Sequence, residues 1–459
     1  MKHLFITFLL SLSALGAHAE QRVPQSQTEI TLSFAPLVRE TAPAVVNIYA
    51  RVVTQTGTRT PFMNDPFFER FFEGFGQPQP RVQNSLGSGV ILGPDGIVVS
   101  NYHVVGQATD IRVVLNDGRE YEARVLLGDQ ASDLAILKIN GASDLPFLAL
   151  RDSETVEVGE LTLAIGNPFG VGQTVSSGIV SGLARSGASN GRGAGYFIQT
   201  DAPINPGNSG GALVDMKGRL LGINTRILSR SGGSNGIGFA IPADLVAAFV
   251  KQARDGNDRF IRPWAGATGQ AVDADLAETL GRDRPGGIML AGLHPLSPLA
   301  EAGFAVGDVV LAVDGAPVGS PGEMLFRMSV ASDQDTATMT RLRDGTETDV
   351  TVALIPPPDD PPRNAVTLPE SAALPGLQLA QVNPAVLTEL NLPISAEGVV
   401  VLDEGPIGRR VGLRRGDLLQ RIDRRDVSTP DQAAELLADA RRGTTVRAIR
   451  GNRRIVLRF

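Results

Sequence analysis

The hydrophobic pattern between residues 85 and 250 consists of short runs rich in β-branched residues, separated by glycine-containing turns. For example, the apolar run 89–92 is followed by the turn 93–96 and by a second apolar run at 97–100. Runs of this length and spacing are typical of antiparallel strands in small barrels. The pattern therefore predicts a mostly β fold with two antiparallel barrels in this part of the chain.

Helices are expected on both sides of this region. Residues 28–50 predict a short helix followed by a strand at 44–49. Residues 244–254 predict a helix that closes the first domain, and the polar, glycine-containing segment 255–258 is typical of a domain boundary.

Residues 259–459 contain an internal repeat. The segment 303–310 (GFAVGDVV) matches 412–419 (GLRRGDLL) at an offset of 109 residues, and Asp314 matches Asp423 in the same register. Each copy continues into a predicted helix that begins with a hydroxyl residue and a proline, which suit the N-cap and the first helical position. We therefore predict two copies of one module, with the proline-rich segment 356–362 as an extended spacer between them.

Composition limits the classes of function. A chain of 459 residues with 42% hydrophobic residues is long enough for two to four domains. The net charge of −7 argues against nucleic acid as the main partner, which usually leaves a basic footprint. The absence of cysteine excludes disulfides and thiol catalysis. With only four histidines, two of them in the leader described next, a structural zinc site is not expected.

Residues 1–19 have the pattern of a secretory signal peptide. Lys2 precedes the apolar run 4–15, and residues 17–19 form a small-x-small cleavage site. The alternative is an uncleaved anchor, but the run is shorter than the roughly 20 residues of a membrane helix. We expect an exported, soluble chain that begins near Glu20 and has no stable membrane insertion.

Ser209 is the candidate nucleophile. It lies among glycines, between polar residues and the apolar run 212–214, which suits a tight turn that presents a hydroxyl at the end of a strand. Gly207 and Gly210 leave the backbone free to aim N–H groups into one concavity. The backbone of Gly207, Asn208 and Ser209 is therefore the candidate oxyanion hole, with the amides of Gly207 and Ser209 as the natural donors.

A serine hydroxyl needs a base to take its proton, and the chain offers few histidines for that role. His3 and His18 lie in the predicted leader, and His294 lies in the repeated region. His103, which follows the strand predicted at 97–100, is left as the candidate base.

Asp133 is the candidate carboxylate behind that base, because it directly precedes the apolar strand predicted at 134–139. Asp201 is the main alternative. It lies eight residues before Ser209 and is interpreted as shaping the loop. The weaker alternatives are Asp110, Asp117 and Asp129. With Asp133 the order along the chain is His, Asp, Ser, as in chymotrypsin-type barrels.

Four ordered motifs resemble the HtrA (Do-like, Deg) serine endopeptidases of bacterial envelopes. They are SNYHVV at 100–105, SDLA at 132–135, GNPFG at 166–170 and GNSGG at 207–211. The resemblance spans nearly the whole chain after the leader. It implies a trypsin-like double β-barrel followed by PDZ domains, with His103 as general base, Asp133 as its orienter and Ser209 as nucleophile. The expected organisation is a signal peptide at 1–19, a protease domain at 20–258, a first PDZ domain at 259–355, a linker at 356–365 and a second PDZ domain at 366–459.

The resemblance also assigns loops around the expected cleft. The insertion at 54–84 carries six phenylalanines, and in the family a long loop here reaches neighbouring subunits or covers the active site. The alternative is a local turn that folds onto its own barrel. The glycine-rich loop 184–196 matches one that senses activators in the family, although glycine there is also common in plain linkers.

The primary specificity pocket is expected between residues 204–208 and 225–238. With Ile237 there and no charged floor evident, we expect it to prefer small aliphatic side chains. The edge that pairs with an extended substrate is expected at Asn224, Thr225, Arg226 and Ile227.

The two repeated modules resemble PDZ domains, which bind extended peptides by adding a strand beside a helix. In the first copy the carboxylate-binding loop is expected at Trp264, Ala265, Gly266 and Ala267, where Ala265 departs from the usual bulky apolar residue. In the second copy the best but weaker match is 376–377. The second copy also collects arginines, namely Arg409, Arg410, Arg414, Arg415, Arg424 and Arg425. Such a run of arginines most often forms a solvated face, and the alternative is a surface that binds an acidic partner or a neighbouring subunit.

The sequence thus predicts an ATP-independent periplasmic serine endopeptidase for unfolded or damaged exported proteins, with chaperone activity and no metal or organic cofactor. Its expected partners are unfolded polypeptides, C-terminal peptides and further copies of itself in a trimer-based homo-oligomer. The alternatives are a chaperone or scaffold that does not cleave, and a regulatory protease with a single substrate that a PDZ-bound peptide triggers.

Overall fold

The computed structural model describes most of the chain after residue 32. The described ranges are 33–53, 82–167, 172–183, 196–205, 207–228, 233–331, 334–438, 440 and 443–458. The predicted leader at 1–19, the phenylalanines of the insertion and residues 184–195 of the predicted sensor loop lie outside these ranges. None of the helices within them is long and apolar enough to cross a membrane.

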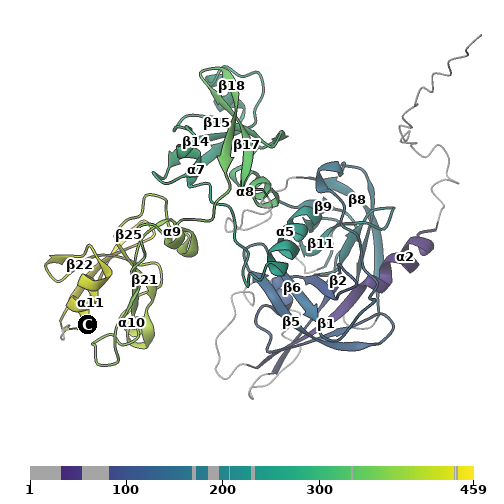
Figure 1. Cartoon of the computed structure of the whole chain (residues 1–459), viewed down its shortest axis with the longest axis horizontal. Coiled ribbons are helices and arrows are strands. Elements are labelled where there is room, and N and C mark those ends of the chain that lie inside the picture. Colours follow the sequence, from purple (N-terminus) through teal and green to yellow (C-terminus); the bar gives the residue numbers. More distant parts are fainter. Residues whose placement is uncertain are drawn as a thin grey trace, which may run out of the picture.

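Two closed six-stranded barrels form the first part of the fold (Figure 1). The first contains β1 (Val45–Val53), β2 (Val82–Ile91), β3 (Ile97–Ser100), β4 (Asp110–Val114), β5 (Glu120–Asp129) and β6 (Leu134–Ile139), closed in the order β1-β2-β3-β6-β5-β4. The second contains β7 (Leu161–Gly166), β8 (Thr174–Gly182), β9 (Ile198–Thr200), β10 (Ala212–Val214), β11 (Leu220–Ile227) and β12 (Gly238–Pro242), closed in the order β10-β11-β12-β9-β8-β7. The strand order is the same in both, and the predicted pair of barrels is confirmed.

One apolar core joins the two barrels. Val90 and Ile136 of the first barrel belong to the same buried cluster as Leu163 and Ile223 of the second. Short helices flank this core, namely α2 (Ala35–Thr41), η1 (Ala42–Ala44), α4 (Tyr102–Val105), η3 (Ser153–Thr155) and α5 (Ala243–Arg254). Helix α5 buries Phe249 in the same cluster, so the two barrels and the closing helix form one packed body.

Two smaller units follow, each built on an antiparallel sheet. The first repeat unit contains β13 (Ala267–Ala271), α6 (Ala274–Thr279), β14 (Ile288–Leu293), α7 (Pro298–Glu301), β15 (Val309–Val313), β16 (Ala316–Pro317), α8 (Pro321–Val330), β17 (Thr336–Arg343) and β18 (Thr346–Ala353). The second repeat unit contains β19 (Val366–Thr367), β20 (Gln378–Gln381), α9 (Pro384–Leu390), β21 (Val399–Asp403), α10 (Gly405–Val411), β22 (Leu418–Ile422), β23 (Arg425–Asp426), α11 (Pro430–Ala438), β24 (Thr445–Arg450) and β25 (Arg453–Arg458). Figure 1 shows them as separate bodies beside the barrels.

The sequence repeat corresponds to a structural repeat of the two units. Buried Asp308 forms an ion pair with Arg343 in the first unit, and buried Asp417 forms the same pair with Arg450 in the second. The sheet orders agree as well, β13-β14-β15-β17-β18 against β20-β21-β22-β24-β25. The second unit has one additional strand, β19, which pairs with β20.

The first repeat unit lies against the barrels through α8. The ring of Tyr196, from the second barrel, stacks on Phe326 with the centroids 4.1 Å apart. Arg327 lies over both rings and forms an ion pair with Glu154. Burial, together with the charges of Glu323 and Asp244, raises the pKa of Tyr196 to about 12. The phenol is therefore neutral in this contact at physiological pH.

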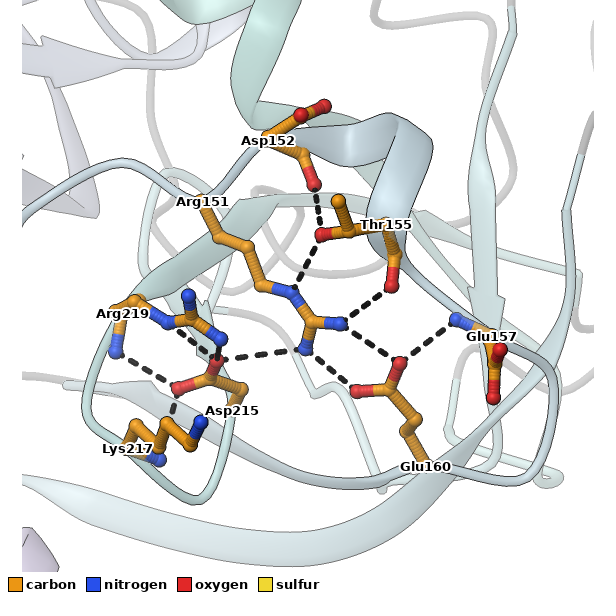
Figure 2. Close-up of polar contacts among 8 residues, drawn as sticks. All are labelled: Arg151, Asp152, Thr155, Glu157, Glu160, Asp215, Lys217 and Arg219. Carbon is orange, nitrogen blue, oxygen red and sulfur yellow. Dashed lines mark hydrogen bonds and ion pairs between the residues drawn. The ribbon is translucent and has the colours of Figure 1, made fainter. Parts of the chain in front are cut away.

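A buried ion cluster holds together the loops of the second barrel (Figure 2). The guanidinium of Arg151, 8% exposed, donates to both oxygens of Glu160, at 2.5 and 2.8 Å, and to Asp215 at 3.4 Å. Asp215 also accepts hydrogen bonds from Arg219. The hydrogen bond from Arg151 lowers the pKa of Glu160, and the reverse interaction raises the pKa of Arg151.

We expect Arg151→Met to lower the free energy of unfolding by about 3 kcal/mol at pH 7, because two carboxylates lose their buried cation. A lowered folded pKa contributes stability that is present above the unfolded pKa of Glu160, near 4.5, and is lost as the pH falls through the folded value. The difference between variant and wild type should therefore shrink below about pH 4. Urea unfolding at several pH values measures it. Arg119→Met, which removes an exposed pair with Asp117, should leave the stability unchanged within error.

Candidate active site

Ser209 lies in a tight turn just before β10, where the second barrel contacts Ser88 of the first. Gly210 has a φ of +83°, and a Cβ at that position would lie 2.1 Å from the carbonyl oxygen of Ser88 in the first barrel. No other residue fits so close to the opposite barrel. The Ser209 hydroxyl is buried and donates a hydrogen bond to the Thr225 carbonyl at 3.2 Å.

The backbone around Ser209 presents two unused amides. The Asn208 N–H donates to the Asn205 carbonyl at 3.0 Å, and the Gly210 N–H donates to the Asn224 carbonyl at 2.8 Å. Within the described residues, the N–H groups of Gly207 and Ser209 have no hydrogen-bond acceptor. These two amides are thus available to an oxyanion, whereas the Asn208 amide is already used inside the turn.

His103 and Asp133 form a close pair in the first barrel. His103 lies in the one-turn helix α4 directly after β3, and its Nδ1 lies 2.9 Å from both carboxylate oxygens of Asp133. Because a carboxylate only accepts, this contact places a proton on Nδ1 and leaves Nε2 as the basic nitrogen. The His103 backbone N–H also donates to Asp133, at 3.0 Å.

Asp133 is held in an unusual conformation. Its φ is +55°, in the left-handed region, and its carbonyl accepts hydrogen bonds from the Asn101 side chain and the Tyr102 amide. Burial alone would raise the pKa of the Asp133 carboxyl. The charge of His103 and the hydrogen bonds from His103 and Thr225 outweigh it and hold that pKa below its usual value. Asp133 therefore faces the imidazole as an ionised carboxylate.

Thr225 connects the His103–Asp133 pair to Ser209. Its hydroxyl donates to Asp133 at 2.6 Å, and its carbonyl accepts from the Ser209 hydroxyl. One buried residue of the second barrel therefore touches both the carboxylate of the first barrel and the serine. The His103–Asp133 pair and the Ser209 hydroxyl are thus linked through Thr225, where the two barrels meet.

Three of the four alternative acids, Asp201, Asp129 and Asp117, are engaged elsewhere. Asp201 accepts the Ile179 N–H at 2.7 Å, as expected for a residue that shapes the loop. Asp129 forms an ion pair with Arg262, and Asp117 forms one with Arg119. Asp133 is the carboxylate that the structure places against the His103 ring.

Comparisons with known proteins agree with this geometry. The family model of the trypsin-like peptidase domain matches residues 87–223, and that of the PDZ domain matches residues 270–354. A probable periplasmic serine endoprotease DegP-like from Halomonas elongata is 37% identical over 95% of this chain and 93% of its own. The periplasmic pH-dependent serine endoprotease DegQ of Escherichia coli is 35% identical over 93% of this chain and 90% of its own. The chain belongs to the DegP-like, HtrA-type serine endoproteases.

A solved relative extends the likeness to the fold. The HtrA-type protease AlgW with a decapeptide is 40% identical and covers 71% of this chain and all of its own, with a TM-score of 0.51. The expected fold class, a trypsin-like double barrel followed by PDZ units, is therefore confirmed.

In this HtrA-type protease the predicted substrate-binding residues differ in their surroundings. The side chains of Asn224 and Thr225 are buried, and Asn224 donates to the Ala212 carbonyl, so these side chains do not face a substrate. Arg226 lies over the Phe197 ring at 5.1 Å. Ile227 and Ile237 are partly buried against the barrel cores. The preference for small aliphatic residues stays a prediction.

The backbone of the predicted carboxylate-binding loop of the first PDZ unit is held by hydrogen bonds to neighbouring segments. Gly266 has a φ of +58°, and the Ala265 carbonyl accepts from the Ser297 hydroxyl at 2.6 Å. The backbone N–H of Trp264 donates to the Ile355 carbonyl, and its ring packs edge-on against His294. The loop thus has a fixed backbone at the entrance to β13. Peptide binding there remains a prediction.

Ser88 is a residue of the protease site that the sequence analysis did not single out. Its N–H donates to the Ser209 carbonyl at 2.9 Å, and its hydroxyl donates to the Gly207 carbonyl at 2.7 Å and accepts from the Asn167 N–H at 2.9 Å. Ser88 is fully buried. It therefore fixes the carbonyl groups of Gly207 and Ser209, the residues on both sides of Asn208. The only sequence signal is its place between two glycines at 87–89.

We expect Ser88→Ala to lower kcat about 10- to 100-fold with little change in KM, because the loop that carries the two free amides loses an anchor. The affinity for a peptide boronic acid, which forms a tetrahedral adduct, should fall in parallel. Thr41→Val removes another buried hydroxyl, one that donates to Leu37 in α2, and should leave kcat unchanged. A loss of stability with unchanged kcat would mean that Ser88 is only structural.

Proposed function

We propose that the chain is an ATP-independent serine endopeptidase that cleaves unfolded or damaged proteins in the bacterial periplasm, with His103, Asp133 and Ser209 as its catalytic residues. The supporting observation is the chain of contacts from the His103 ring to Asp133, from Asp133 to Thr225 and from Thr225 to Ser209. The names of the relatives, periplasmic serine endoproteases, support the compartment and the reaction.

In the proposed mechanism the Ser209 hydroxyl leaves the Thr225 carbonyl and donates to His103 Nε2 when substrate binds. Its oxygen attacks the peptide carbonyl while His103 takes the proton and later returns it to the leaving amine. Asp133 holds the imidazole in the required tautomer and stabilises its charged form. The amides of Gly207 and Ser209 hold the negative oxygen of the tetrahedral intermediate. No step requires a metal or an organic cofactor.

Extended polypeptides are the substrate class that we propose. β13 is an edge strand of the first PDZ unit, with Thr268 and Gln270 exposed, and strand addition at such an edge recognises backbone rather than a particular sequence. The solved structure of AlgW with a decapeptide supports peptide binding by this class of protein. We further propose chaperone activity and a trimer-based homo-oligomer, both on the family resemblance. Suppression of client aggregation by an inactive variant and the native mass test them.

Labelling with a fluorophosphonate tests the assignment of the nucleophile. The reagent should attach to Ser209, as located by mass spectrometry of the digested protein, and labelling should compete with casein as substrate. Attachment to a different serine would move the active site elsewhere.

A further inference from the structure

We propose that the peptide-binding groove of the second PDZ unit is occupied by the chain's own segment 363–368, so that external peptides enter the first unit only. This inference rests on the proposed peptide-binding role of the PDZ units. It names the site that binds and the site that is closed by an internal ligand.

The segment 363–368 pairs with β20 along its outer edge. Val366 and Thr367 form the antiparallel strand β19 opposite Leu379 and Gln378. The Gln381 N–H donates to the Arg363 carbonyl at 2.7 Å, which extends the pairing to the far end of β20. This is the edge at which a PDZ domain adds a peptide strand.

Leu368 lies where the last residue of a bound peptide would lie. Its carbonyl accepts from the Gly376 N–H at 3.1 Å, and Gly376 belongs to the predicted carboxylate-binding loop of this unit. Its own N–H donates to the Leu377 carbonyl at 2.9 Å. The side chain is 2% exposed and packs in one cluster with Ala433 and Leu437 of α11. α11 is the counterpart of α8, so Leu368 fills the space between strand and helix.

The first PDZ unit shows the same groove without an occupant. Among the described residues no strand pairs with the outer edge of β13, and Thr268, Gln270 and Ala271 are exposed. In β20, by contrast, Leu379 and Ala380 are buried. Gly266 and Gly376 both have a positive φ at the start of these strands, so the two loops correspond. The difference between the units is the presence of segment 363–368.

Covalent attachment makes this internal ligand hard to displace. A segment joined by a short loop acts at a local concentration of about 1 mM. A free peptide that binds the open groove with a Kd near 10 µM would then appear about 100-fold weaker. The ligand class follows from the segment itself: an extended chain that ends in a large aliphatic residue.

Hydrogen exchange of the whole chain tests the occupation without any substitution. The fragment containing residues 376–381 should exchange more slowly than the corresponding fragment 266–271, because both edges of β20 are paired. Equal or faster exchange at 376–381 would overturn the proposal.

A titration tests whether a usable groove lies under the segment. The probe is a hexapeptide with the sequence of residues 363–368 and a free carboxylate, and the protein is the Ser209→Ala chain, which does not cleave it. We expect one peptide per chain, and two per chain after the further change Leu368→Asp. Val456→Asp, at a 64% exposed position of β25, is the matched control and should still bind one.

The outcomes separate the two proposals. One peptide per chain in Leu368→Asp, with fast exchange at 376–381, would mean that the freed groove does not bind peptide, and would overturn the inference. No binding by the Ser209→Ala parent would contradict the peptide-binding role of the first unit, while the exchange result would still decide whether the second groove is filled. If Leu368→Asp does not fold, the exchange of the wild-type chain decides alone.

Discussion

Ser209→Ala should reduce the turnover of casein by about 10⁵-fold or more and abolish fluorophosphonate labelling, because the attacking oxygen is removed and no second nucleophile replaces it. Any residual rate would come from the two free amides at Gly207 and Ser209 and from substrate binding. The expected loss concerns kcat, since the variant keeps the backbone that contacts the substrate.

The fold of this variant should be intact. Among the described residues the Ser209 hydroxyl makes one hydrogen bond, to the Thr225 carbonyl, and the alanine side chain fits within the volume that serine occupies. Thermal unfolding should therefore shift little. Ser428→Ala, in the second PDZ unit, is the control and should keep full turnover and full labelling. Undiminished cleavage of casein by Ser209→Ala would refute the assignment of the nucleophile.

Much of the fold was predictable because it depends on local patterns. Short apolar runs between glycine turns specify antiparallel strands, and several of these glycines, among them Gly96, have a positive φ in the structure. The repeat was predictable because Asp308 and Asp417 occupy the same register, and each is a buried carboxylate that pairs with a partly exposed arginine. Both features depend on the type of residue at single positions, which can be read directly from the sequence.

The support of the site was less predictable, because it depends on how two barrels meet. Motifs identify His103, Asp133 and Ser209. Ser88, which contacts the Ser209 turn, lies more than a hundred positions before it in the sequence and belongs to no such motif. Thr225 was expected in the edge that pairs with an extended substrate, which stays a prediction, and its hydroxyl contact with Asp133 was not foreseen. Neither contact follows from the strand that carries the residue, since both arise from the relative position of the barrels.

The internal ligand of the second PDZ unit could not be predicted, because the composition around it is typical of a linker. Segment 363–368 adjoins a proline-rich stretch, and its first three residues fall in the predicted linker. A two-residue strand has no periodicity to detect. The segment is recognised as a ligand only by its partner, the outer edge of β20. The corresponding edge of β13 in the first unit has no paired strand among the described residues.

Asp133→Asn should lower kcat about 10⁴-fold while the protein stays folded. The carboxylate accepts from the His103 ring, the His103 amide and the Thr225 hydroxyl, so all its partners are donors. An asparagine has only one acceptor atom, and its NH₂ group would face a donor or turn His103 Nδ1 into an acceptor. In that tautomer the proton lies on Nε2, which cannot take the proton of Ser209. The activity should return partly at high pH, where serine ionises more readily without a base.

Asp201→Asn is the matched control for this change, because Asp201 is the main alternative acid and its hydrogen bond from the Ile179 N–H can be kept by the amide oxygen. We expect this variant to retain kcat within about 3-fold, since the interaction that it preserves is a backbone contact away from the imidazole. The pair of variants separates orientation of the base from shaping of the loop. A large loss of kcat in Asp201→Asn with a small loss in Asp133→Asn would reverse the two roles. That result would contradict the inference drawn from the contacts of the Asp133 carboxylate with the imidazole and Thr225.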